Sequence, residues 1–146
     1  MALIGILAAI GLPVMSSAIE RNKVWTGSEA VGAQIRQARL RAISRNTRFR
    51  VRFDCPTAGQ LRVLVVTGDA GVDDAVDRCD QTIALDSGVV GLPSGVTYGV
   101  VPTLEVNGRG VFSAAGGLPL TIDVTYGPYT RSMAVSATGQ IAFGAF

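Results

Sequence analysis

Residues 1–15 read MALIGILAAIGLPVM, an apolar run that continues without a turn signal into a polar, arginine-rich segment. In that segment, small and branched side chains recur at alternating spacings of four and three, which places them on one narrow stripe of an α-helix. The stripe consists of Val24, Ser28, Val31, Ile35, Ala38 and Ala42. The pattern predicts one long helix, with an apolar first part and a second part that packs on a folded domain.

The sequence changes its period from Arg48 onward. Phe49, Val51 and Phe53 alternate with arginines, which is typical of a strand with one buried face. Glycines and prolines then recur at short intervals and predict short strands joined by turns. The further strands expected are 61–67, 83–85, 96–101, 103–106, 110–113, 120–126, 131–135 and 140–143. One long helix followed by many short strands predicts an α+β fold, with the N-terminal helix packed on an antiparallel β-sheet or β-sandwich.

The 146 residues support one domain with an N-terminal appendage. We expect residues 1–22 to form the apolar half of the helix, in a membrane or a filament core. Residues 23–146 form the globular domain, of which 23–46 are helical and 48–146 are rich in strands. Three interpretations of the apolar run stay open: a cleaved signal peptide, a complete transmembrane helix, or the remainder of a longer anchoring helix. Fifteen helical residues cover only about 22 Å of a hydrocarbon layer about 30 Å thick, and this favours the third.

The string from Leu3 to Pro13 resembles the second half of the N-terminal helix of type IV pilins and type II secretion pseudopilins. This resemblance implies that the helix enters the inner membrane and later the filament. The residues concerned are Ile4, Gly5, Ile6, Leu7, Ile10 and Pro13. The prepilin peptidase motif, with its glutamate, is not in this chain. Cleavage and N-methylation are therefore expected of a longer parent protein.

Later segments narrow the resemblance to the GspH/FimT minor pseudopilins. They are QARLRAISRN at 37–46, FRV at 49–51, VNGRGVFS at 106–113 and VSATGQI at 135–141. The resemblance implies a structural subunit of a type IV pilus or a type II secretion pseudopilus that takes part in assembly or tip formation. It also implies a single-pass inner-membrane protein with a periplasmic domain, and its partners are other minor and major pilins or pseudopilins. Trp25, Arg36 and Leu40 are the candidate subunit contacts. For Trp25, a place at the membrane interface and packing within the molecule are the alternatives.

An alternative function is DNA binding by a minor pilin during natural transformation. Seven arginines lie between positions 36 and 52, and such a cationic strip is the footprint expected for phosphate contacts. The candidate contacts are Arg45, Arg48, Arg50 and Arg52. Other interpretations of the strip are a solvated face, pairing with the acidic segment 69–80, or contact with anionic lipid or neighbouring subunits. Some FimT-like proteins carry a C-terminal Gly-Arg-x-Arg element, and the matching segment here, 139–142, is GQIA.

The composition argues against an enzyme. The chain has no histidine, which excludes Ser-His-Asp and Cys-His machinery, and no phosphate-binding glycine loop. We expect no cofactor and no small-molecule substrate. Five aspartates between positions 69 and 80 could offer oxygen ligands to calcium, although their spacing does not match an EF-hand; a solvated acidic loop is the alternative.

Cys55 and Cys79 bracket this acidic stretch. If they are bonded, they close a loop of about 25 residues, worth about 3–4 kcal/mol in the chain-entropy model. The alternative is two buried free thiols, and an extracytoplasmic location favours the disulfide.

Overall fold

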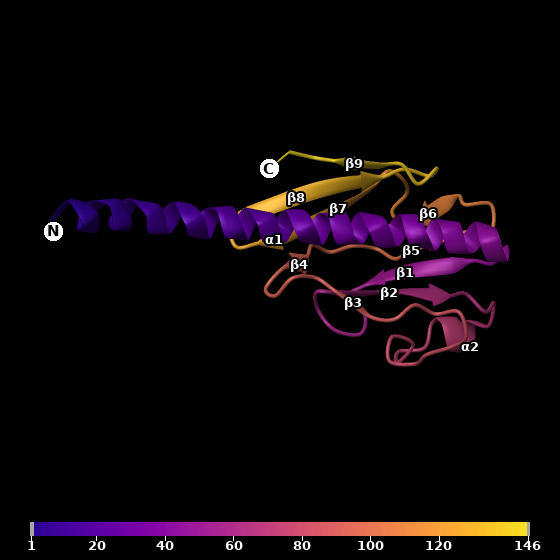
Figure 1. Cartoon of the computed structure of the whole chain (residues 1–146). Coiled ribbons are helices and arrows are strands. Elements are labelled where there is room, and N and C mark those ends of the chain that lie inside the picture. Colours follow the sequence, from indigo (N-terminus) through magenta and orange to yellow (C-terminus); the bar gives the residue numbers. More distant parts are fainter. Residues whose placement is uncertain (1, 146) are drawn as a thin grey trace.

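The computed structural model consists of one long helix and two antiparallel sheets (Figure 1). It describes the backbone of residues 2–145 and the side chains of residues 16–145. Helix α1 runs from Ala2 to Arg45 without interruption. Its first part projects away from the strands as a rod, and its second part lies along both sheets.

The first sheet has five strands in the order β3-β2-β1-β5-β6, and the second has four in the order β4-β7-β8-β9. All pairs are antiparallel. The elements are β1 (Phe49–Phe53), β2 (Gln60–Val65), α2 (Ala70–Asp73), β3 (Val90–Gly91), β4 (Thr97–Tyr98), β5 (Leu104–Val106), β6 (Phe112–Ala114), β7 (Leu120–Tyr126), β8 (Tyr129–Val135) and β9 (Ile141–Phe143). Two hairpins, β1–β2 and β7–β8, form the centres of the two sheets.

The hydrophobic core lies between α1 and the inner faces of the two sheets. Alternate residues of β7 and β8 face it, among them Ile122, Val124 and Met133, each fully buried. Phe49 and Val51 of β1 face it from the other sheet. The period of two that predicts these strands is therefore the alternation between a core face and an outer face.

The predicted fold class is confirmed, and so is the strand at 120–126. The strand expected at 83–85 is wrong, because these residues belong to an irregular segment in which Leu85 has a φ of 84°. The short strand β3 was not expected, and the segment expected to be an acidic loop contains the one-turn helix α2. Strand β3 pairs with Gln60 and Leu61 of β2, about 30 positions upstream, which a local pattern does not contain.

Candidate functional site

The two opposite sides of α1 differ in burial. The stripe that faces the sheets has no exposure at all: Val24, Ser28, Val31, Ile35, Ala38 and Ala42 are each 0% exposed. These side chains pack against β1, β5, β7 and β8. A helix with a fully covered stripe is fixed in its rotation about its own axis, so the same residues determine which side chains point away from the domain.

Large apolar side chains are exposed on the rest of α1. Leu40 is 67% exposed, Ile19 57%, Trp25 48% and Ile43 46%. At 3.6 residues per turn, Trp25, Arg36 and Leu40 lie within an arc of about 60° on the helix. The three candidate subunit contacts therefore share one side of α1, together with Ile43. We call this side, defined by Trp25, Arg36, Leu40 and Ile43, the outward face.

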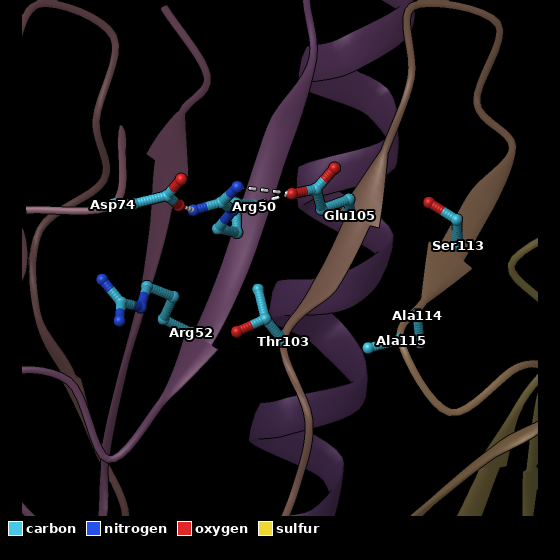
Figure 2. Close-up of a pocket in the computed structure, with 8 residues that line it drawn as sticks. All are labelled: Arg50, Arg52, Asp74, Thr103, Glu105, Ser113, Ala114 and Ala115. Atoms are coloured by element: carbon cyan, nitrogen blue, oxygen red, sulfur yellow. Dashed lines mark hydrogen bonds and ion pairs between the residues drawn. The ribbon is translucent and has the colours of Figure 1, made fainter. Parts of the chain in front are cut away.

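The four candidate phosphate contacts do not form one free cationic surface. Arg50 bonds to Asp74 at 2.8 Å and to Glu105 at 2.7 Å, on the face of the sheet away from α1 (Figure 2). Arg52 lies on the same face, and its Nη1 is buried without an acceptor among the described residues. Arg45 and Arg48, in contrast, are exposed. Pairing with the acidic segment, one of the alternatives for the strip, accounts for Arg50.

A third exposed arginine lies near Arg45 and Arg48. The turn between β5 and β6 packs so closely on the end of α1 that a Cβ at Gly108 would lie 2.5 Å from the Oδ1 of Asn46. This contact brings the exposed Arg109 to the same end of the molecule. None of the three arginines has an ion pair within the described part of the chain.

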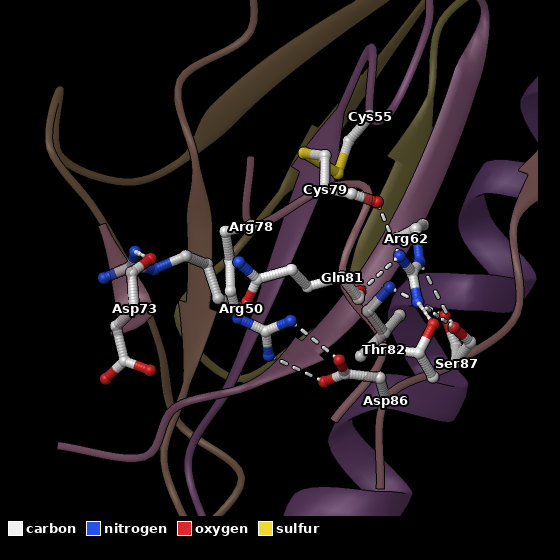
Figure 3. The surroundings of a disulfide bond; sticks show 11 residues. Arg50, Cys55, Arg62, Asp73, Arg78, Cys79, Gln81, Thr82, Asp86 and Ser87 are labelled. Carbon is white, nitrogen blue, oxygen red and sulfur yellow. Dashed lines mark hydrogen bonds and ion pairs between the residues drawn. A yellow bond between two sulfur atoms is a disulfide. The ribbon is translucent and has the colours of Figure 1, made fainter. Parts of the chain in front are cut away.

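The outer face of β2 is covered by residues 69–88, which we call the strap (Figure 3). The Cys55–Cys79 disulfide, with an S–S distance of 2.08 Å, joins the strap to the end of β1. Arg62 of β2 donates to the carbonyl oxygens of Cys79, Gln81 and Ser87. Free thiols, the alternative left open by the sequence, are therefore excluded.

A buried ion pair closes the strap. Arg78 binds Asp86 through two nitrogen–oxygen contacts of 2.7 and 2.9 Å, and both side chains are 0% exposed. The Asp86 carboxylate also accepts the backbone N–H groups of Ile83 and Val65. Burial by itself raises the pKa of Asp86, but the bonds from Arg78 and these amides outweigh it and hold the pKa below its usual value.

Asp73 plays a similar part at the other end of the strap. It accepts the backbone N–H groups of Thr67 and Gly68 at 2.9 and 2.8 Å and the Thr67 hydroxyl at 2.9 Å. These bonds outweigh the desolvation that raises its pKa, so the pKa is lowered. Asp73 and Asp74, two aspartates of the predicted acidic loop, thus have separate structural roles. Within residues 16–145, no three acidic or cysteine side chains converge on a point that could hold a metal ion.

A shallow cavity of about 400 Å³ lies on the outer face of β1, β5 and β6. Figure 2 shows Arg50 and Glu105 bonded across its floor, with Thr103, Ser113 and Ala115 around them. The paired charges leave no side chain there in an arrangement typical of a nucleophile or a general base.

The apolar residues proposed for the membrane or filament lie outside the described side chains. Ile4, Gly5, Ile6, Leu7, Ile10 and Pro13 belong to the part of α1 for which only the backbone is described. Among the described residues, no helix has the length and apolarity needed to cross a membrane.

A projecting helix whose other half covers two antiparallel sheets defines the class of pilin-like subunits. The chain belongs to the family described as type II transport protein GspH, which matches residues 28–139. It is therefore a minor pseudopilin of the GspH/FimT type. No curated protein sequence matches the chain.

Two solved structures show the same fold, both of the type IV minor pilin FimU of Pseudomonas aeruginosa (strain PAO1). The first, in space group P21, has 18% identity and a TM-score of 0.60, and the match covers 86% of this chain and 91% of FimU. The second, in space group P65, has 15% identity and a TM-score of 0.57, with 83% and 92% covered.

Sequence reasoning missed the structural roles of three charged side chains, which are Arg62 of β2 and Arg78 and Asp86 of the strap. Arg78 and Asp86 lie in a segment whose composition predicts exposure. The apolar run around Arg62, with Leu61 before it and Val63–Val65 after it, is the one local signal that β2 is covered on both faces.

Proposed function

We propose that this chain joins a pilus or pseudopilus through the outward face of α1. The observation that carries the proposal is the asymmetry of the helix: its stripe is 0% exposed, whereas Trp25, Leu40 and Ile43 are between 46% and 67% exposed. Exposed apolar side chains on a projecting helix favour burial against another apolar surface. In a filament of pilin-like subunits, that surface is the helix of a neighbouring subunit.

The role proposed is structural and not enzymatic. The family is one of transport-machine subunits, and Arg50 and Arg78 of the domain are used in ion pairs that hold the fold. Arg36 lies between Trp25 and Leu40 on the outward face and offers a charge that can select the neighbour's register. Initiation of assembly at the filament tip is the stage at which a minor subunit of this kind acts in our proposal.

Substitution of Leu40 by glutamate tests this role. Leu40→Glu places a charge in the proposed contact and should reduce filament assembly or secretion at least tenfold. The folded domain should keep its thermal midpoint, because Leu40 makes no core contact. Val100→Glu is the matched control, since Val100 is an apolar, fully exposed residue outside α1. Equal assembly by the Leu40→Glu and Val100→Glu variants would contradict the proposal.

A second function is favoured by the arginines at the end of α1. Arg45, Arg48 and Arg109 are exposed and without ion pairs in the described part of the chain, as expected for contacts to nucleic-acid phosphates. The test is DNA binding by fluorescence anisotropy at two salt concentrations. Arg45→Gln/Arg48→Gln should lower the slope of log affinity against log salt by about two, and Arg36→Gln is the control. Affinity unaffected by salt or by the double substitution would exclude this function.

A further inference from the structure

Two cations of α1 contact the two tyrosines at the tip of the β7–β8 hairpin. The Nζ of Lys23 lies 4.4 Å from the centre of the Tyr126 ring and 3.2 Å from its hydroxyl. The Arg21 guanidinium carbon lies 5.1 Å from the centre of the Tyr129 ring. Tyr126 and Tyr129 are the last cross-strand pair before the turn. The tip is therefore fixed across α1 at the point where the helix leaves the domain.

Trp25 lies on α1 about one turn beyond Arg21, next to these cation–ring contacts. The Arg131 guanidinium lies 3.8 Å from its ring centre and is itself held by Ser28 at 2.6 Å and Glu29 at 3.1 Å. The indole is thus backed by a buried, fixed cation, while 48% of the residue remains exposed. We call Arg21, Lys23, Trp25, Tyr126 and Tyr129 the collar.

The collar lies at the end of the domain that faces the projecting part of α1. Figure 1 shows the start of β8 and the C-terminal end of the chain at this end, beside the helix. The apolar run of the sequence ends at residue 15, and Ile19, 57% exposed, adds an apolar side chain four residues later. Cations and aromatic rings that follow an apolar helix are the composition found at a membrane–water interface.

The spacing along the helix fits a headgroup layer. A rise of 1.5 Å per residue puts Arg21 about 3 Å and Trp25 about 9 Å beyond Ile19. The polar layer on each side of a bilayer is about 5–8 Å thick. Helical side chains lean toward the N-terminus, so the Trp25 ring lies nearer to Ile19 than its Cα does.

We propose that the collar rests in the phospholipid headgroup layer before the subunit enters a filament. Arg21 and Lys23 contact lipid phosphates, and the three aromatic rings lie at the boundary with the acyl chains. Because the hairpin tip is fixed across α1, this contact sets the tilt of the whole domain on the membrane. The inference rests on the proposed function, together with the expectation that residues 1–22 lie in the membrane before the subunit enters a filament.

Trp25 provides the measurement, since it is the one tryptophan of the chain. The full chain is reconstituted in vesicles of phosphatidylethanolamine and phosphatidylglycerol (3:1), with a fraction of lipid brominated near the headgroup end of the acyl chain. Flotation of the vesicles reports insertion, and quenching of Trp25 reports the depth of the collar. We expect flotation and at least twofold stronger quenching by these lipids than by lipids brominated near the chain end.

The variant Arg21→Gln/Tyr129→Ala removes one collar contact and should halve the quenching while flotation persists. Arg109→Gln, at the other end of the domain, should leave both unchanged, and circular dichroism checks that each variant is folded. Flotation without quenching of Trp25 would overturn the collar alone. Protection from aqueous acrylamide without lipid quenching would assign Trp25 to a neighbouring subunit and also overturn it. Failure to float would overturn the expected insertion of residues 1–22 into the membrane, and the collar with it, whereas the filament contact is tested separately by Leu40→Glu.

Discussion

The two central hairpins differ in what covers their outer faces, which are the faces turned away from α1. In β7–β8 the core side chains alternate with polar ones such as Thr121 and Asp123, which face solvent. In β1–β2 the second strand is buried on both faces, because the strap covers Arg62 and Leu64. The β7–β8 hairpin thus needs no covering segment on its outer face, whereas the β1–β2 hairpin is covered by a segment that a disulfide and a buried ion pair hold in place.

The strap on β1–β2 therefore serves mainly the stability of the fold, whereas the tip of β7–β8 is available for contacts outside the domain. The β7–β8 tip contacts α1 through exposed and half-buried groups, which are available to lipid or to other subunits. The strap contacts are internal, and they give partners to charged groups that burial would otherwise leave unpaired. Breaking the strap should therefore cost stability, and breaking the tip should cost little.

The largest effect is expected at the buried ion pair. Asp86→Ala leaves Arg78 buried without its counter-charge, so the free energy of unfolding should fall by about 3–5 kcal/mol. Denaturant unfolding followed by circular dichroism measures it. Asp123→Ala on β7 is the matched control and should cost less than about 1 kcal/mol. Equal losses of unfolding free energy in Asp86→Ala and Asp123→Ala would contradict the difference between the outer faces of the two hairpins. The double change Arg78→Met/Asp86→Leu should recover only part of the loss, because the backbone N–H groups of Ile83 and Val65 still lose their acceptor.

The disulfide should rank next. Cys55→Ser/Cys79→Ser releases a cross-link between residues 24 positions apart, which the chain-entropy model values at about 3.5 kcal/mol. Amide hydrogen exchange should accelerate in the strap and in β2, while β7 and β8 change only through the loss in global stability. Uniform acceleration across both hairpins, with no greater change in the strap, would contradict the comparison.

Acid should lower the stability of the protein through the two strap carboxylates, Asp73 and Asp86. Asp73 and Asp86 have pKa values below those of unfolded carboxyl groups. Their contribution to stability is complete above about pH 4 and is lost as the pH falls through the folded pKa values. Thermal midpoints between pH 7 and pH 3 measure this loss. The slope below pH 4 should be reduced in Asp86→Asn, and an unchanged slope would exclude Asp86 as a source.

The smallest effect is expected at the hairpin tip. Tyr126→Leu removes the ring and hydroxyl that bind Lys23 but keeps an apolar side chain. Because cation–π contacts at exposed sites are worth about 0.5–1 kcal/mol, the thermal midpoint should change by only a few degrees. A loss as large as that of Asp86→Ala would mean that the tip, like the strap, holds the fold together.

The sequence predicted those elements whose pattern is set by their own neighbours. The stripe of α1 and the alternation of β7 are local periodicities, so the helix and this strand could be recognised without the fold. The failed strand at 83–85 shows the limit. Its apolar residues resemble a strand, but Asp86 draws the backbone N–H of Ile83 to its carboxylate and pairs with Arg78 from eight residues upstream.

The candidate site residues also fall into those that local periodicity predicts and those that depend on distant partners. Exposure of Trp25, Arg36 and Leu40 follows from their offset from the stripe, which the sequence contains. The pairing of Arg50 does not follow from the sequence, because its partners Asp74 and Glu105 are 24 and 55 positions away. Alternation places Arg50 on the outer face of β1, but only the folded chain shows which acids reach it.

By itself, the sequence determined that a long helix with an apolar start packs one stripe on a β-rich domain, since periodicity and burial act over a few neighbouring residues. Tertiary structure decided which charges are paired, which cover the outer face of β2 and which remain exposed. Ion pairs, carbonyl contacts and the disulfide join residues far apart in the chain, so their geometry exists only after both sheets have formed on α1.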